Sequence, residues 1–170
     1  MAFTGDREGA LAILDEKRAL LPHSGQPNAL GSWFMLVLVI EGLVVLGERS
    51  QVAQLYPLAC ELIATGAVTL MGTARFTQTV AGAAAAAAGK WETAEWHFQL
   101  ALQHAEAFPH RVEQADIRRF QAMMLIDRAT QGDREIAKTR LAKALETYMR
   151  IGMPRHIEMT QTLLDQIAAG

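Results

Sequence analysis

The fold is decided by a helical stretch that begins at a glycine: Gly89-Lys90-Trp91-Glu92-Thr93-Ala94-Glu95-Trp96-His97-Phe98-Gln99-Leu100-Ala101-Leu102. Small and apolar residues recur on one face of this helix, at offsets i, i+4, i+7, i+8 and i+11: Ala94, Phe98, Ala101, Leu102 and Ala105. The alternation of small and large side chains lets two helices approach closely and interdigitate. Comparable stretches occur at three other places, which indicates a helical repeat.

Four glycines mark the repeat: Gly5, Gly47, Gly89 and Gly132, with separations of 47−5 = 42, 89−47 = 42 and 132−89 = 43 residues. The positions five, nine and sixteen residues after each glycine have matching character: Ala10, Leu14 and Leu21; Val52, Tyr56 and Ile63; Ala94, Phe98 and Ala105; Ala137, Leu141 and Tyr148. A fixed period of this size is typical of stacked helix pairs. Glycine suits the turn between two helices because a left-handed residue often ends a helix.

The pattern resembles the tetratricopeptide repeat, in which a Gly-x-x-x-x-Ala turn precedes a large apolar residue and then a small one. The matching sets are Gly89, Ala94, Phe98 and Ala101; Gly132, Ala137, Leu141 and Ala144; and Gly5, Ala10 and Leu14 with Pro22. The period exceeds the ~34 residues usual for that family, and Lys17 and Arg18 depart from its pattern in the first unit. The expected fold is all-α, a right-handed solenoid of antiparallel helix pairs with a period of about 42.

Three short segments of the sequence are Leu55-Tyr56-Pro57-Leu58, Phe108-Pro109-His110-Arg111 and Ile151-Gly152-Met153-Pro154-Arg155-His156. These segments resemble the C-terminal repeat region of bacterial regulators that carry an ATPase module, often with an adenylate-cyclase domain. This resemblance implies that the chain is a regulatory part of a larger signalling ATPase or nucleotide cyclase.

We expect one helical-repeat domain over residues 1–170. Its parts are a half repeat (6–21), helix pairs at 29–65, 70–106 and 110–150, and a terminal helix at 154–168. Within the pairs the expected helices are 29–46, 48–65, 70–88, 91–106, 110–130 and 133–150. Pro57 is expected to kink the helix over 48–65. Asp6 and Asp133 are candidate helix caps.

Composition narrows the class of protein. The formal net charge of −2 favours neither nucleic acid nor an acidic membrane as partner. Cys60 is the one cysteine, so it cannot form an internal disulfide, and we interpret it as a core residue in a cytoplasmic protein. The apolar run from Trp33 to Leu46 is 14 residues long, whereas a membrane-spanning helix needs about 20. Residues 1–18 are too polar for a secretory signal.

The motifs favour a protein that is not an enzyme and needs no cofactor. Gly82 to Lys90 resembles a phosphate-binding loop only superficially, because six alanines separate the glycines and Trp91 replaces the hydroxyl residue. His104, His110 and Glu113 are weak candidates for a metal site, since their spacing matches no known motif. We otherwise expect the five histidines to lie at the surface or in turns.

The tetratricopeptide resemblance implies a concave groove that binds a protein or peptide. Its groove positions correspond here to Phe34, Val37, Glu41, Phe76, Thr79, Arg119 and Ala122. Glu41 is interpreted either as a partly exposed residue or as a carboxylate that recognises a ligand. Two further hypotheses remain open. One is a homodimer through the apolar face of the N-terminal helix (Ala10, Ile13, Leu14 and Leu21), and the other is a small hydrolase or metal-dependent enzyme with a site in the groove.

Overall fold

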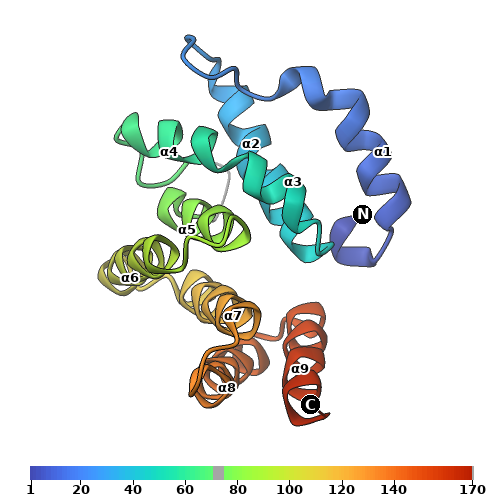
Figure 1. The fold of residues 1–170 in the computed structure, drawn as a ribbon, viewed down its shortest axis with the longest axis vertical. Helices are drawn as coiled ribbons and strands as arrows, with labels where there is room; N and C mark the ends of the chain where they lie inside the picture. Colours follow the sequence, from blue (N-terminus) through green and yellow to red (C-terminus); the bar gives the residue numbers. More distant parts are fainter. Residues whose placement is uncertain (71–74, 170) are drawn as a thin grey trace. The chain divides into compact units, whose positions relative to one another are not determined.

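A computed structural model describes residues 1–70 and 75–169, and this part of the chain is built from helices (Figure 1). The pairing of Thr69 with Phe76 is an isolated antiparallel bridge. The predicted all-α class is therefore confirmed. Among the described residues, no helix is long and apolar enough to cross a membrane.

The chain divides into two compact units, Met1–His97 and Phe98–Gly170, and the boundary falls within α6 (Trp91–Ala107). The N-terminal unit contains α1 (Arg7–Lys17), α2 (Leu30–Val45), α3 (Arg49–Gln54), α4 (Tyr56–Ala64) and α5 (Thr77–Ala87), with short 3-10 turns at Ala2–Thr4 (η1) and Arg18–Leu20 (η2). The C-terminal unit contains α7 (Arg111–Arg128), α8 (Asp133–Ile151) and α9 (Pro154–Ala169).

The alanine-rich helix α5 is central to the N-terminal unit. It packs against α2, α3 and α4, and its residues from Thr77 to Ala86 are all buried. Alanine side chains are short, so three neighbouring helices can approach the α5 backbone closely. The apolar core around α5 consists mainly of branched residues from α2 to α4, among them Leu36, Ile40 and Leu62.

In the C-terminal unit α7 packs on α8, and α9 packs on both. Ala115, Ala144 and Tyr148 form the centre of a core cluster that Met153 and Ile157 complete. The face predicted from the repeat is confirmed on α6 and α8 except at Leu102, which is half-buried. The other residues of the face are 0% exposed: Ala94, Phe98, Ala101 and Ala105; Ala137, Leu141, Ala144 and Tyr148.

The glycines that define the repeat have left-handed backbone angles. Their φ values are 81° at Gly5, 75° at Gly47, 71° at Gly89 and 87° at Gly132. A residue with a Cβ atom is strained at such angles, which explains why glycine recurs there. The prediction of a turn between helices is confirmed at Gly47, Gly89 and Gly132, whereas Gly5 follows the short 3-10 turn η1.

The predicted helix over residues 48–65 is wrong in one respect: it is broken rather than kinked. α3 ends at Gln54, and α4 begins at Tyr56 with Pro57 in its first turn. Proline has no backbone N–H, and the first turn is where a helix tolerates this loss. The break also changes which residues are buried. Val52, Ala59 and Leu62 are buried, whereas three residues of the expected face are only half-buried: Tyr56, Cys60 and Ile63.

The helix predicted over 70–88 begins later than expected, at Thr77, and residues 71–74 of that prediction lie outside the described residues. Two hydrogen bonds link Arg75 and Thr77, at the start of the helix, to Thr69 and Ala67. The Thr77 hydroxyl donates to the Ala67 carbonyl at 2.7 Å, and the Thr69 hydroxyl donates to the Arg75 carbonyl at 3.0 Å. Phe76 is extended, with φ −77° and ψ 142°.

The two predicted caps have different outcomes. Asp6 caps α1, and its carboxylate accepts a hydrogen bond from the Gly9 amide at 2.9 Å. α1 itself ends at Lys17, followed by the 3-10 turn, so the helix predicted to Leu21 is shorter. Asp133 is not the cap of α8, because Gly132 occupies the N-cap position and the Asp133 carboxylate binds Arg128 and Thr130 instead.

Candidate functional site

An apolar groove lies between α1 and α2 in the N-terminal unit, and its volume is about 240 Å³. None of the side chains of its twelve lining residues carries a charge: Met1, Ala2, Ala10, Leu11, Ile13, Leu14, Met35, Leu38, Val39, Gly42, Leu43 and Leu46. We call this surface the α1/α2 groove.

The sequence of α2 explains why one of its faces is left for the groove. This helix is apolar on nearly every side. One face, which includes Leu36 and Ile40, packs in the core of the unit. A second face lines the groove with residues at offsets i, i+3, i+4, i+7 and i+11, the spacing of one helix surface: Met35, Leu38, Val39, Gly42 and Leu46. α1 supplies the opposite wall.

Large apolar side chains at the groove remain open to solvent. Leu38 is 55% exposed, Met1 is 54% exposed and Ile13 is 44% exposed. Single exposed apolar residues are common on protein surfaces, but a contiguous apolar lining with an exposed rim is typical of interaction sites. Glu41 is the one charged residue in the sequence between Arg18 and Glu48. The groove is therefore suited to an apolar partner.

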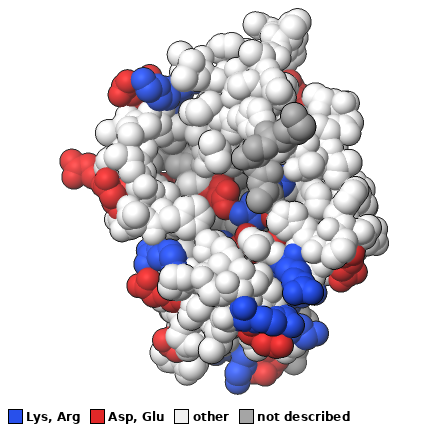
Figure 2. Space-filling model, turned by 180° about the vertical axis from the view of Figure 1, so that it is seen from behind, with Lys and Arg blue, Asp and Glu red and all other residues white. Residues whose placement is uncertain are grey.

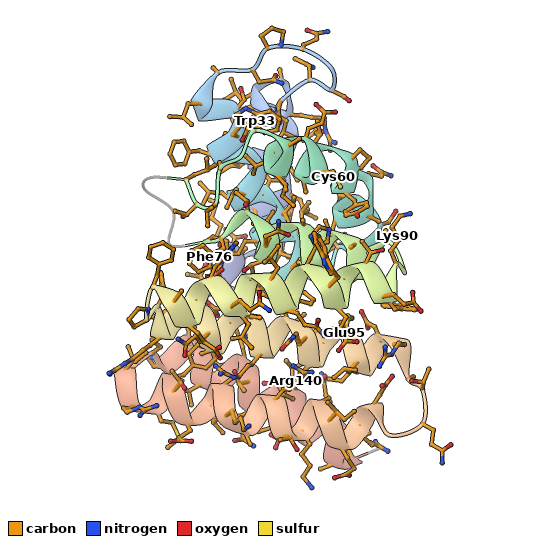
Figure 3. The ribbon with its side chains drawn as sticks, turned by 90° about the vertical axis from the view of Figure 1, so that its left-hand side faces the viewer. Trp33, Cys60, Phe76, Lys90, Glu95 and Arg140 are labelled. Carbon is orange, nitrogen blue, oxygen red and sulfur yellow. The ribbon has the colours of Figure 1, made fainter. Side chains whose placement is uncertain are left out.

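The residues of the N-terminal unit that were predicted to bind a partner in a concave groove are mostly buried. Val37 is 1% exposed and lies in the core of its unit, and Phe34 packs against that core. Phe76, at the start of α5 (Figure 3), is 4% exposed, and Thr79 is 0% exposed. Their role in binding a partner stays a prediction.

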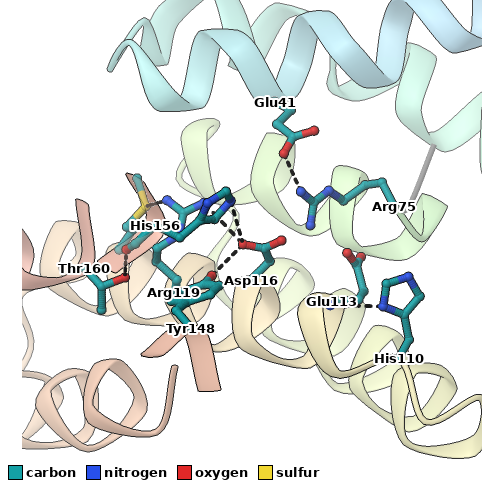
Figure 4. A network of polar contacts seen from close by, with 10 residues as sticks. Glu41, Arg75, His110, Glu113, Asp116, Arg119, Tyr148, His156 and Thr160 are labelled. Atoms are coloured by element: carbon teal, nitrogen blue, oxygen red, sulfur yellow. Dashed lines mark hydrogen bonds and ion pairs between the residues drawn. The ribbon is translucent and has the colours of Figure 1, made fainter. Parts of the chain in front are cut away.

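Glu41 forms an ion pair within its own unit. The Arg75 guanidinium donates from Nη2 to Glu41 Oε1 (Figure 4). The two side chains are 16% and 9% exposed, so the pair is largely withdrawn from water. Breaking such a pair leaves an uncompensated buried charge. The carboxylate predicted to recognise a ligand therefore has a structural partner.

In the C-terminal unit, the predicted groove residues Arg119 and Ala122 are 1% and 0% exposed. Arg119 Nη2 lies 3.6 Å from Asp116 Oδ1, and the Tyr148 hydroxyl donates to the same oxygen at 2.5 Å (Figure 4). His156 Nε2 is 3.9 Å from that oxygen. Burial, reinforced by the Asp116 charge, raises the pKa of Tyr148 above its ordinary range, so its hydroxyl keeps its proton.

The weak metal candidates do not form a cluster. Among the described residues, no group of three or more His, Cys, Asp and Glu side chains is placed to hold a metal ion. His110 Nδ1 accepts a hydrogen bond from the Glu113 amide at 3.2 Å, which makes His110 the cap of α7. The expectation of surface or turn histidines is wrong for His97, which is 5% exposed and whose Nδ1 lies 2.6 Å from Gln78 Oε1.

Charges of both signs lie on the face of the molecule shown in Figure 2. On this face, Lys and Arg side chains are interspersed with Asp and Glu.

No protein-family model matches the chain, and neither a curated protein nor a solved structure is significantly similar to it. The geometry thus defines an all-helical protein with an apolar surface groove.

Sequence reasoning identified only one wall of this groove, the apolar face of the N-terminal helix. The sequence did not predict that α2 lines the groove, because a helix that is apolar on nearly every side is expected to be buried all round. The sequence does contain a signal for this wall: a second apolar face of α2 that includes no charged residue. It consists of Met35, Leu38, Val39, Gly42 and Leu46.

Proposed function

We propose that the chain is a non-catalytic protein-interaction module that binds the apolar face of a partner's helix in the α1/α2 groove. The main observation in support is that all the side chains lining the groove are uncharged and that Ile13 and Leu38 among them are exposed. An amphipathic helix that inserts its apolar stripe into a groove is a common mode of peptide recognition. The eleven residues of α1 span about 16 Å, which matches about three turns of a partner helix.

The side chains of the groove support this partner chemistry. A charged segment would lose its hydration there without gaining an ion pair with any lining side chain, which is unfavourable. Met1 and Met35 in the lining are flexible and polarizable, so they can adapt to different apolar side chains. An apolar helix face therefore fits the groove better than an acidic or basic peptide.

The proposal includes the arrangement expected from the repeat, in which antiparallel helix pairs stack as a right-handed solenoid. The left-handed glycines at a period of 42–43 residues support it, as do the buried faces of α6 and α8. A regulatory role within a larger bacterial ATPase or cyclase would suit such a module. This part of the proposal rests on the resemblance of residues 55–58, 108–111 and 151–156 to such regulators.

The test uses the full chain and a fluorescent 18-residue helical peptide with leucines on one face and alternating Glu and Lys on the other. A peptide of the same composition in scrambled order is the control. We expect saturable binding by anisotropy for the amphipathic peptide only. Leu38→Glu should weaken this binding at least about tenfold because it puts a charge into the apolar groove.

Leu30→Glu is the matched control, because Leu30 is also on α2 and is 59% exposed but does not line the groove. It should change the affinity less than about twofold. Equal losses in both variants, or equal binding of the scrambled peptide, would contradict the proposal. A mass that doubles with concentration in light scattering and returns to one chain with Leu38→Glu would instead identify a second copy as the occupant.

A further inference from the structure

A second cavity lies within the C-terminal unit, where the C-terminal half of α6 meets α7 and α8. Its volume is about 360 Å³, which is within the range of small-molecule sites. Six residues line it: Leu102, Arg118, Ile136, Thr139, Arg140 and Lys143. Of these described lining residues, three are cations and none is acidic.

The helical period of α8 concentrates these groups. Four lining residues follow one another at offsets i, i+3, i+4 and i+7, so they share one face of α8: Ile136, Thr139, Arg140 and Lys143. Arg118 adds a third cation from α7, and Leu102 adds an apolar wall from α6. The same cavity therefore combines positive charge with apolar surface.

Hydrogen bonds hold the two arginines in place. Arg118 Nη1 donates to the Gln114 carbonyl at 2.9 Å. Arg140, on α8 (Figure 3), donates from Nη1 to Gln121 Oε1. Because hydrogen bonds already hold both guanidinium groups, less side-chain entropy is lost when a ligand binds in the cavity.

The neighbouring charges leave the cavity attractive to an anion. Glu106 Oε1 is 4.0 Å from Arg118 Nη2, but the Glu106 side chain is 59% exposed, so water weakens the pairing. Lys143 forms no ion pair with any residue that the structure describes. Its ammonium is exposed on a flexible stem and can reach a bound oxyanion.

We infer that this cavity binds a phosphate monoester of a small apolar group. Such a phosphate carries about −1.5 to −2 charges at pH 7 and three acceptor oxygens, which suits a cluster of cations better than a single carboxylate does. Arginine forks bind phosphate oxygens in pairs. Leu102 and Ile136, which is 47% exposed, would contact the organic part of the ester.

This site is independent of the proposed interaction module, because its residues lie between positions 102 and 143 whereas the α1/α2 groove is formed by residues 1–46. Failure of one proposal leaves the other intact. The probe is phenyl phosphate, titrated into the full chain by isothermal calorimetry at constant ionic strength. Benzenesulfonate has the same ring and one negative charge, and inorganic phosphate lacks the ring.

We expect saturable one-to-one binding of phenyl phosphate, with at least about fivefold weaker binding of benzenesulfonate and of inorganic phosphate. Lys143→Gln and Arg118→Gln should each weaken binding about tenfold. Lys138→Gln is the matched control: it removes the same charge from α8 outside the cavity and should change affinity less than about twofold.

Three outcomes would overturn the inference. They are heat that does not saturate, an equal loss of affinity with Lys138→Gln and Lys143→Gln, and a benzenesulfonate affinity equal to that of phenyl phosphate. The two variants Lys143→Gln and Lys138→Gln both alter exposed residues, so both proteins should fold as the parent chain does.

Discussion

Replacing Asp133 by Asn should destabilise the turn between α7 and α8. The carboxylate accepts four hydrogen bonds. Its Oδ2 atom accepts from Arg128 Nε at 2.9 Å, from the Thr130 amide at 2.9 Å and from the Thr130 hydroxyl at 2.7 Å, and its Oδ1 atom accepts from Arg128 Nη2 at 2.6 Å. Asparagine offers one oxygen and turns an N–H₂ group toward the remaining donors.

The expected loss in the free energy of unfolding follows from this geometry. A hydrogen bond to a charged group contributes about 1.5–3 kcal/mol, and bonds that share one carboxylate are not additive. The Asp133 side chain is 3% exposed and that of Arg128 is 23% exposed, so water can replace only part of what is lost. We therefore expect Asp133→Asn to lower the stability at pH 7 by about 2–3 kcal/mol.

The pH dependence gives a second, independent readout. The hydrogen bond from Arg128, together with those from Thr130, holds the pKa of Asp133 well below its ordinary value of 3.8. A carboxyl whose pKa is lowered by folding stabilises the native state above its unfolded pKa, and this stabilisation is lost as the pH falls toward the folded pKa. The difference between parent and variant should therefore be constant from about pH 7 to 5 and shrink below about pH 4.

The assay is urea unfolding followed by circular dichroism at several pH values. Asp15→Asn is the matched control, because the Asp15 side chain is 82% exposed and lies 3.5 Å from Arg18 Nε. This exposed pair should be worth less than about 0.5 kcal/mol. Equal effects of the two substitutions at pH 7, or a difference for Asp133→Asn that persists unchanged at pH 3, would refute the reasoning.

Two further predictions concern backbone strain and a buried histidine. Ala129 ends α7 with a left-handed φ of 52°, so Ala129→Gly should raise the free energy of unfolding by about 0.5–1 kcal/mol. Ala142→Gly within α8 should instead lower it by about 1 kcal/mol. Thermal unfolding in which both variants change stability in the same direction would contradict this. Burial lowers the pKa of His97 below 6.5, so the stability associated with neutral His97 is complete above pH 6.5 and is lost as the pH falls. His97→Gln should therefore flatten the decline in unfolding free energy between pH 7.5 and 5.5, and an unchanged slope would count against a neutral buried His97.

Much of the secondary structure could be predicted from local patterns. The turns at Gly47, Gly89 and Gly132 followed from spacing and from the left-handed backbone that glycine tolerates. The bounds of α6 to α9 agree with the prediction to within two residues at each end, because their periodic faces are long and uninterrupted. Predictions failed where a local effect competes with the period, as at Pro57 and before Thr77.

The candidate sites were much harder to predict. Val37 and Arg119 were assigned to a groove by analogy with a repeat family, but a position in a repeat does not determine which neighbours cover a side chain. The cavity for which we propose a phosphate ligand was not predicted from the sequence. Arg118 and Arg140 are 22 residues apart, so only the packing of α7 on α8 brings them to one cavity.

The sequence by itself determined the helical class, the glycine turns and the small-large faces of α6 and α8, because these depend on backbone preference and on a period within one helix. The tertiary structure alone decided which apolar face of α2 is buried and which lines the α1/α2 groove, and which cations share a cavity. Those outcomes depend on contacts between residues far apart in the chain, and side-chain pattern within one helix does not encode them.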